Sequence, residues 1–345
     1  MDPVSHVLLG ASLGHVAAGR VFGRSAALAA GLAALLPDAD IFIRSPVDPL
    51  VAIEYHRGLT HSLVAVPVGA AIVAAMWLLP TGFRQPRRWL GLWATCCLAY
   101  LSHILLDAAT SYGTQLAWPF SRERFGWDLI SIIDPVFTLS LLTGLLLALR
   151  RPATRPAAIA LAFAFTYLLV GGIQRSRAEH CLHALAASRG HRPERVEVMP
   201  TLANNLVWRA LYLHEGRIVS DRIRVGWFTA PRIREGWNLP IAGDGDLSPS
   251  EHTRNRRRSF ERFAWFSEEW VARSPTDPTL LADMRYSLSA EAFDPIWAIR
   301  FTAPDSAADV EWVNRSRQRK VSVIETWREI SGGDPRFRSM PRSPL

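Results

Sequence analysis

The chain has 345 residues, of which 49% are hydrophobic and 20% are charged, and its formal net charge is +8. Residues 1–173 hold 12 Arg, no Lys and 9 acidic residues, whereas residues 174–345 hold 26 Arg, one Lys and 22 acidic residues. This uneven division excludes a disordered chain, a fibrous chain and a single soluble domain. It predicts a membrane-embedded N-terminal domain, residues 1–173, and a soluble C-terminal domain, residues 174–345.

The cysteines and the basic charge exclude further classes. Three cysteines are too few for a disulfide framework, and Cys96, Cys97 and Cys181 form no CxxC zinc or redox motif. Membrane proteins collect arginine in cytoplasmic loops, and the sequence contains no nucleic-acid motif, so we expect no nucleic-acid partner. Residues 1–6 lack the positive charge of a signal peptide, so we expect no cleavable leader.

Five or six apolar stretches precede residue 174. A spanning helix needs about 20 apolar residues. Val7–Gly19 and Ser25–Leu36 are shorter, so they predict a helical hairpin. The better spanning candidates are Leu63–Leu79, Trp89–Leu106, Pro135–Leu149 and Ala157–Ile173. We therefore expect an α-helical membrane bundle of about five or six apolar helices, followed by a soluble α+β domain.

The connections between these stretches differ in charge. Three alternate connections hold only basic residues: Arg20 and Arg24; Arg84, Arg87 and Arg88; Arg150, Arg151 and Arg155. The intervening connections, residues 37–62 and 107–134, hold most of the acidic residues of this half. The positive-inside rule places the first set in the cytoplasm. The acidic connections and residues 174–345 are then extracytoplasmic, in a multi-pass protein of the inner (plasma) membrane.

Residues 174–345 read as a mixed domain. Val196–Met199, Trp208–Leu213, Ile218–Val225, Leu280–Leu288 and Ile296–Thr302 have the composition of strands, with a turn at 214–216. Arg258–Val271 has the pattern of an amphipathic helix, with Phe260, Phe263, Phe266 and Trp270 at helical spacing. We interpret this aromatic stripe as core packing or packing on the membrane surface, rather than as a ligand site.

Histidine and aspartate occupy unusual positions in the apolar half. His103 and Asp107 lie four residues apart near the end of an apolar helix, so both side chains share one face. Ionisable groups at membrane depth are costly unless they are paired or coordinated. The pair fits either a shared divalent cation or a His–Asp hydrogen bond that locks two helices together.

The segment His56–Ser62, with sequence HRGLTHS, begins the next apolar stretch. Gly58 permits a turn that would let His56 and His61 converge, although the pair would also suit an exposed loop. Arg57 has the chemistry to hold a phosphate through two hydrogen bonds.

Three further residues lie at the ends of the predicted hairpin. Asp38 and Asp40, in the sequence PDAD, suit either a metal bridge or a solvated helix end. His6 opens the first apolar helix and would suit an interface as well as a metal.

In the predicted topology these side chains gather at the extracytoplasmic ends of their helices. The candidate metal ligands are His6, Asp38, His56, His61, His103 and Asp107. They would suit one or two divalent ions, which we expect to be zinc, with water in an open position. Such an ion lowers the pKa of its water to about 7. The candidate catalytic residues are Asp40, as a base, and Arg57.

The order of these motifs resembles the YdjM-type membrane-bound metal-dependent hydrolases. The resemblance covers roughly residues 1–140 and rests on DPVSH at 2–6, PDAD at 37–40, HRGLTHS at 56–62, HILLD at 103–107, YGT at 112–114 and the segment from Asp128 to Asp134-Pro135. It implies a helical membrane protein with a metal-dependent hydrolase activity. It also implies a distant likeness to zinc-dependent phospholipase C and P1 nuclease, whose His-xxx-Asp pair His103 and Asp107 match.

The leading hypothesis is a membrane-bound metallohydrolase that cleaves a phosphoester in a lipid or lipid-linked substrate. Intramembrane His and Asp would also suit a divalent-ion transporter. A third alternative is a non-catalytic membrane anchor whose residues 174–345 bind a partner. The sequence does not specify the oligomeric state.

Overall fold

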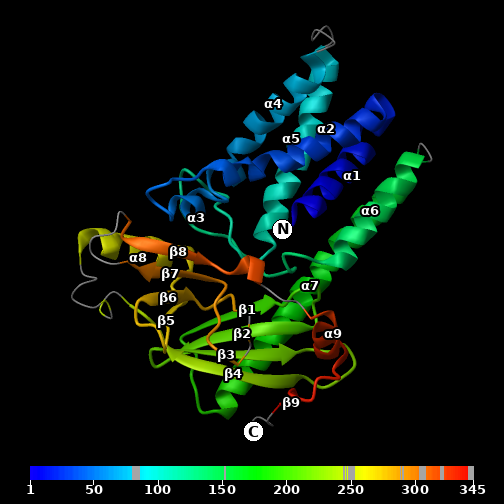
Figure 1. The fold of residues 1–345 in the computed structure, drawn as a ribbon. Coiled ribbons are helices and arrows are strands. Elements are labelled where there is room, and N and C mark those ends of the chain that lie inside the picture. The colour runs from blue at the N-terminus through cyan, green and yellow to red at the C-terminus, as the bar shows by residue number, and fades with distance from the viewer. Residues whose placement is uncertain are drawn as a thin grey trace. The chain divides into compact units, whose positions relative to one another are not determined.

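The computed structural model describes residues 1–79, 86–150, 153–243, 245, 247, 253–287, 289, 291–302, 308–318 and 322–340. Two compact units are present (Figure 1). The first, helical unit comprises Met1–Phe42, Tyr55–Ile173 and Pro200–Asn205, and the second comprises Ile43–Glu54, Gln174–Met199 and Leu206–Leu345. The predicted boundary between residues 173 and 174 stays a prediction.

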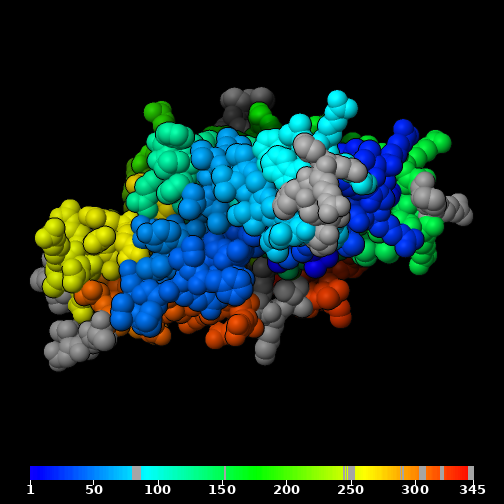
Figure 2. Space-filling model, turned by 90° about the horizontal axis from the view of Figure 1, so that it is seen from above, coloured from blue at the N-terminus to red at the C-terminus, as the bar shows by residue number. Residues whose placement is uncertain are grey.

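The helical unit is built from apolar helices and, within the described residues, two short 3-10 turns. Its elements are α1 (Pro3–Phe22), α2 (Arg24–Leu35), η1 (Leu36–Phe42), η2 (Leu59–His61), α4 (Ala65–Leu78), α5 (Pro86–Ala108), α6 (Pro135–Arg150) and the first part of α7 (Arg155–Ser188). Figure 2 shows a face on which the segments coloured blue to cyan, including α2, α4 and α5, lie side by side.

Among the described residues, three segments are long and apolar enough to cross a membrane: Arg24–Phe42, Arg87–Ala108 and Arg155–Ser188. A fourth span exists if Val51–His61 and Ala65–Leu78, bent by 77°, count as one. The expected five or six helices are therefore not confirmed. One reason is that α6 has only 16 residues. A second is that α1 buries the polar residues Ser5, His6, Ser12 and His15. The predicted cytoplasmic residues Arg84 and Arg151 lie outside the described residues.

Small residues let α1 and α2 pack as the predicted hairpin. The turn between them is Gly23, whose φ of 61° is in the left-handed region that favours glycine. A Cβ atom at Gly14 would lie 2.3 Å from the Cβ of Ala30 and 2.5 Å from the carbonyl oxygen of Ala26. The two backbones therefore approach each other as closely as glycine allows.

Helix α5 packs against α1, α2 and α4. The loop that follows it turns back onto its C-terminal end, where Trp127 N donates to Ala108 O over 2.7 Å and Leu129 N donates to Ala109 O over 2.8 Å. Gly171 of α7 lies so close to this loop that a Cβ would be 2.0 Å from Leu129 O. Loop and helix contacts thus fix the end of α5 that carries His103 and Asp107.

The second unit contains two antiparallel sheets. The five-stranded sheet has the order β1 (Arg195–Pro200), β2 (Val207–His214), β3 (Arg217–Arg224), β4 (Arg232–Pro240) and β9 (Arg338–Ser339). The four-stranded sheet has the order β5 (Val271–Arg273), β6 (Leu280–Asp283), β7 (Trp297–Phe301) and β8 (Val310–Asn314). The remaining elements are α3 (Val51–Tyr55), α8 (Arg254–Phe266), η5 (Ser316–Gln318) and α9 (Val323–Ser331).

The five-stranded sheet has an apolar cluster on each face. The second part of α7 packs on one face, where Leu182 meets Trp208 and Tyr212. The four-stranded sheet packs on the other, where Leu211 meets Trp270. The predicted turn at 214–216 joins β2 to β3, with positive φ at Glu215 and Gly216, as a two-residue hairpin turn requires.

The aromatic stripe of α8 belongs to the core. Phe260, Phe263, Phe266 and Trp270 are all buried. The helix ends at Phe266, not Val271 as predicted, because Glu268 and Glu269 take positive φ. The predicted strand from Leu280 ends at Asp283, and Leu288 lies outside the described residues.

We predict that Gly14→Leu destabilises the helical unit more than Ala17→Leu, which adds the same side chain to an exposed position of α1. Overpacking typically costs about 1–3 kcal/mol. Thermal unfolding in detergent checks this: Gly14→Leu should lower the midpoint by several degrees, and equal midpoints would contradict the close packing of α1 on α2.

Candidate metal centre

Four side chains of the helical unit bring one ligand atom each to a common point. They are Asp38 from η1, His61 from the end of η2, and His103 and Asp107 from α5. These ligand atoms all lie within 4.8 Å of one another. His61, His103 and Asp107 are buried, and the Asp38 side chain is 19% exposed.

The distances between the ligand atoms are short and similar. Nε2 of His61 lies 3.1 Å from Nε2 of His103 and 3.2 Å from Oδ2 of Asp107. Nε2 of His103 lies 3.5 Å from the same Oδ2. Oδ1 of Asp38 lies 3.7 Å from His61 Nε2 and 3.6 Å from His103 Nε2.

The hydrogen bonds behind the ligands fix where the imidazole protons are. Nδ1 of His103 lies 2.6 Å from the carbonyl oxygen of Ala34, which can only accept, so Nδ1 donates. Nδ1 of His61 lies 3.1 Å from Oδ2 of Asp40 and donates in the same way. In the neutral imidazoles, both Nε2 atoms then carry lone pairs directed at the common point.

The positions of these lone pairs indicate whether the four residues can bind a metal ion. Oδ2 of Asp107 is buried and receives no hydrogen bond from the residues that the structure describes. A proton on His61 Nε2 could form a hydrogen bond to only one of the neighbouring acceptor atoms. A cation at the common point would instead bind the acceptor atoms of all four residues. Ligands at 2.0–2.2 Å from zinc in a tetrahedron lie about 3.3–3.6 Å apart, which is close to the five distances given above. The donor set therefore fits one divalent ion.

The other oxygen of Asp107 faces positive or hydrogen-bonding groups. Oδ1 lies 2.9 Å from Nη2 of Arg57 and 3.0 Å from Nε2 of His6, and the amino group of Met1 pairs with it. The ring of His6 stacks on that of His103, with centroids 3.7 Å apart. His6 thus contacts a ligand residue but lies outside the four-residue cluster.

Arg57 is buried and strained. Its Nη1 donates to the carbonyl of Asp107 and to Thr110 Oγ1, and its guanidinium lies 4.7 Å from the centre of the Tyr112 ring. The residue with left-handed backbone in this turn is Arg57, with φ of 57°, and not Gly58, on which the sequence prediction relied. Such strain, about 1–3 kcal/mol, persists where the surroundings hold the residue in place, often at functional sites.

Asp40 lies beside the ligands rather than among them. Its Oδ1 is 2.8 Å from Nδ1 of His56, and its Oδ2 accepts from Arg57 N, Thr60 Oγ1 and His61 Nδ1. A carboxylate in this position fixes the orientation of a ligand histidine. Its predicted role as a base stays a prediction.

His56 also lies outside the four-residue cluster. Its ring centroid is 6.0 Å from that of His61, and its side chain is 28% exposed. The structure thus brings all the predicted site residues into one neighbourhood but gathers only Asp38, His61, His103 and Asp107 around one point. The individual roles of all eight residues stay predictions.

Sequence reasoning missed three supporting groups. They are the carbonyl of Ala34, Thr60, and the hydroxyl of Tyr100, which donates to Thr60 O over 2.6 Å and holds the turn before His61. A backbone carbonyl leaves no signal in a sequence. Thr60 stood within the HRGLTHS motif, and Tyr100 stood in an apolar stretch outside the quoted motifs, so neither was identified as a support of the ligands.

Comparison with known proteins places these motifs in a family. The sequence model of the YdjM inner membrane protein family matches residues 1–178. The chain is 34% identical over 152 residues to the uncharacterized protein YfhP of Bacillus subtilis, covering 42% of this chain and 45% of YfhP.

Two Escherichia coli relatives are similar over shorter segments. The inner membrane protein YbcI is 33% identical over 106 residues, covering 29% of this chain and 57% of YbcI. The inner membrane protein YdjM is 39% identical over 102 residues, covering 27% of this chain and 48% of YdjM. The matched segments span about half the length of these relatives, and no solved structure matches. The chain is a membrane protein that belongs to the YdjM inner membrane protein family.

Proposed function

We propose that this protein is a membrane-bound metal-dependent hydrolase that cleaves a phosphoester in a lipid or lipid-linked molecule. The observation that carries the proposal is the convergence of Asp38, His61, His103 and Asp107, with their acceptor atoms directed at one point. A divalent cation can accept lone pairs from two imidazole nitrogens and two carboxylate oxygens at once, whereas a water molecule donates only two hydrogen bonds.

We propose that the ion is zinc and that a single ion is bound. Two imidazoles and two carboxylates without thiolates suit zinc, and manganese is the alternative that the ligands also permit. A second ion would have to use Oδ1 of Asp107 and Nε2 of His6. That side of Asp107 already faces the guanidinium of Arg57, whose positive charge disfavours another cation there.

The chemistry divides between the ion and the side chains around it. A divalent ion held by these four residues would have to take water as a fifth ligand, and it would then lower the pKa of that water and polarise a phosphoryl oxygen. His56 is partly exposed, and Asp40 holds its Nδ1, which leaves Nε2 to accept and return a proton. We therefore assign proton transfer to His56 and the positioning of His56 and His61 to Asp40.

An anionic substrate suits the charges of the site. Arg57 already pairs with Asp107, so its predicted direct hold on a phosphate requires the guanidinium to turn toward substrate. We take the distant likeness that the family resemblance implies, between the His103–Asp107 pair and zinc-dependent phospholipase C and P1 nuclease, as support for a phosphoester substrate.

A lipid substrate follows from the position of the ligands on their helices. Asp38 lies near the C-terminal end of the apolar segment Arg24–Phe42, and Asp107 lies one residue before the end of the segment Arg87–Ala108. A site at the ends of membrane-crossing segments faces the headgroups of the bilayer. The charge of the connecting loops favours the extracytoplasmic side of a multi-pass protein for this site and for residues 174–345.

We predict that protein purified in detergent binds about one divalent ion per chain and that His103→Gln removes it. The matched control is His15→Gln, on α1 about 14 Å from His6, because neither ring nitrogen of the buried His15 has a hydrogen-bond partner among the described residues. Elemental analysis gives the metal content, and thermal unfolding confirms that both variants fold. Equal metal content in the two variants would contradict the proposed centre.

We predict that the metal-loaded protein hydrolyses bis(4-nitrophenyl) phosphate or a short-chain phospholipid, and that His56→Gln lowers kcat while metal content is retained. Proton transfer by a side chain typically contributes about 10²–10⁴-fold. A loaded protein that cleaves neither ester but moves zinc into liposomes would instead identify a transporter.

We predict that Asp40→Asn weakens metal affinity about 10–100-fold, because an amide is a poorer partner for His61 Nδ1–H than a carboxylate is. Competition with a chromogenic chelator measures the affinity. Glu123→Gln, in an exposed loop position, is the control and should bind metal as the wild type does. An Asp40→Asn protein with unchanged affinity would exclude the orienting role.

A further inference from the structure

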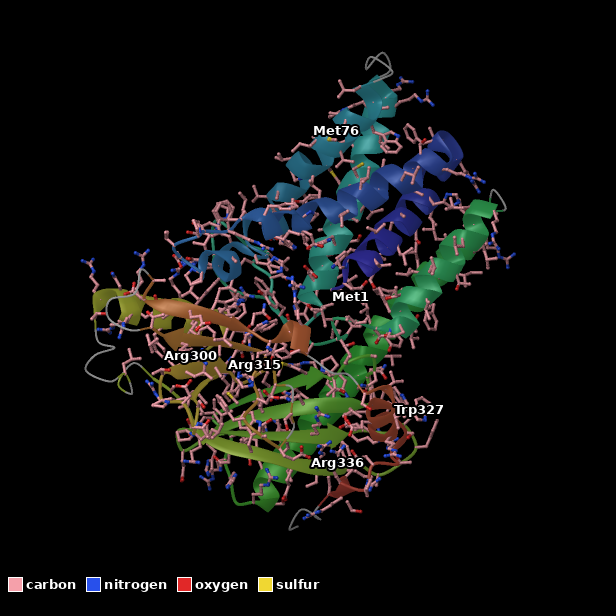
Figure 3. All side chains as sticks on the ribbon, viewed as in Figure 1. Met1, Met76, Arg300, Arg315, Trp327 and Arg336 are labelled. Carbon is pink, nitrogen blue, oxygen red and sulfur yellow. The ribbon has the colours of Figure 1, made fainter. Side chains whose placement is uncertain are left out.

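Helix α9 of the second unit has its apolar face on the outside. Val323, Ile324 and Trp327 are 78%, 66% and 67% exposed and share one helix face by their spacing. The buried position of the helix is a carboxylate, Glu329, which lies 2.5 Å from Arg222 and 2.7 Å from Arg234. A helix on the surface of a soluble domain normally has the opposite arrangement. In Figure 3 the labelled Trp327 lies on this helix.

A second exposed apolar group lies in the loop between β3 and β4. Phe228 is fully exposed, with a relative accessibility of 101%, and its neighbour Trp227 is 44% exposed. Exposing two adjacent aromatic side chains to water is unfavourable, because each has a large apolar area whose burial against a partner lowers the free energy.

Arg224 joins this loop to α9. Its Nε donates to the carbonyl of Ile330 at the end of α9 over 3.0 Å, and its Nη1 donates to Thr229 Oγ1 in the loop over 3.2 Å. The two apolar groups therefore belong to one part of the second unit. We name the set Trp227, Phe228, Val323, Ile324 and Trp327 the aromatic edge.

The aromatic edge is tied to α7 just beyond the apolar part of that helix. Gln174 Nε2 donates to the carbonyl of Val225 over 2.9 Å, and Arg177 Nη2 donates to the carbonyl of Gly226 over 2.9 Å. The guanidinium of Arg177 lies 5.2 Å from the centre of the Trp227 ring. Gln174 directly follows Ile173 in one continuous helix, Arg155–Ser188, which qualifies as a membrane span. The loop is thus held within about one helical turn of the residue at which the apolar segment ends.

Three arginines lie beside the aromatic edge without a carboxylate partner among the described residues, and the exposed Glu325 of α9 lies between Ile324 and Trp327. Arg177, Arg224 and Arg232 donate to backbone carbonyls, to a glutamine oxygen and to a hydroxyl, and within the described part of the chain none of the three forms an ion pair. Burial, together with the nearby charge of Arg232, lowers the pKa of Arg224. Arginine beside exposed tryptophan and phenylalanine is the composition of a membrane–water interface.

We propose that the aromatic edge is a second membrane attachment, which inserts into the headgroup region of the leaflet where the apolar part of α7 ends. The bilayer is the favoured occupant because the covalent path from the span to the loop is only a few residues long. Arg177 and Arg232, which are partly exposed, would then meet anionic lipid phosphates, whereas the buried Arg224 holds the loop on α9. The attachment would fix the second unit at the bilayer surface, independently of any chemistry at the metal centre.

The test measures the depth of a spin label in lipid nanodiscs that hold one chain each and contain phosphatidylethanolamine and phosphatidylglycerol. Cys96, Cys97 and Cys181 are first replaced by alanine, and a label is attached at Phe228→Cys. The control label is at Arg217→Cys, an exposed position at the opposite end of strand β3, about 23 Å from Arg224. Power saturation then compares relaxation by oxygen, which concentrates in lipid, with relaxation by a water-soluble nickel chelate.

The proposal predicts that the label at 228 is relaxed more by oxygen and several-fold less by nickel than the label at 217, and that a label at Trp327→Cys behaves like the one at 228. Nickel relaxation at 228 equal to that at 217 would overturn the proposal. Protection of 228 from both reagents would also overturn it, since that result indicates a contact with protein. Thermal unfolding midpoints show that each labelled variant is folded.

Discussion

The structure depends on the cost of placing imidazoles and carboxylates inside a cluster of apolar helices. Each such group is expensive at membrane depth unless it is paired or coordinated. In this protein, two histidines and two aspartates direct acceptor atoms at one point, and a cation there satisfies them together. Under the proposed function, the cation that would relieve this desolvation would also activate water, so the folding of the helical unit and its chemistry would depend on the same four side chains.

The packing of the helices around this point holds the cluster residues in place. Gly14 and Ala30 let α1 and α2 meet closely, and α2 then presents the carbonyl of Ala34 to His103. Tyr100 holds the turn that carries His61, while Asp40 sets the orientation of the His61 ring. His103 and His61 are thus supported from outside the cluster, as the histidine ligands of a metal site are.

The sequence predicted the parts of the site that rest on local geometry. The spacing of His103 and Asp107 places them on one helix face whatever the rest of the chain does, and the PDAD and HRGLTHS motifs carried the other two ligands. Asp38 was predicted as a ligand and Asp40 as a base, but the spacing of the two residues does not by itself decide which one faces the common point, because that depends on the turn of η1. The sequence also could not show that Arg57, rather than Gly58, takes the left-handed conformation.

The fold prediction also failed where the outcome depends on tertiary structure rather than on local sequence. Apolar stretches were identified correctly, but their number as spans depends on where helices bend, as between His61 and Ala65. Residues 43–54 pack with the second unit because Asp48 and Glu54 pair with Arg262, a contact more than 200 positions away in sequence. The inverted face of α9 was equally hidden, since only tertiary structure shows that Glu329 points inward.

The most direct measurement of the central claim is X-ray absorption at the zinc edge of the loaded protein. The account predicts a first coordination sphere of two imidazole nitrogens with oxygen ligands at about 2.0–2.2 Å and no sulfur. A sphere of oxygens alone, or one that contains sulfur, would contradict it.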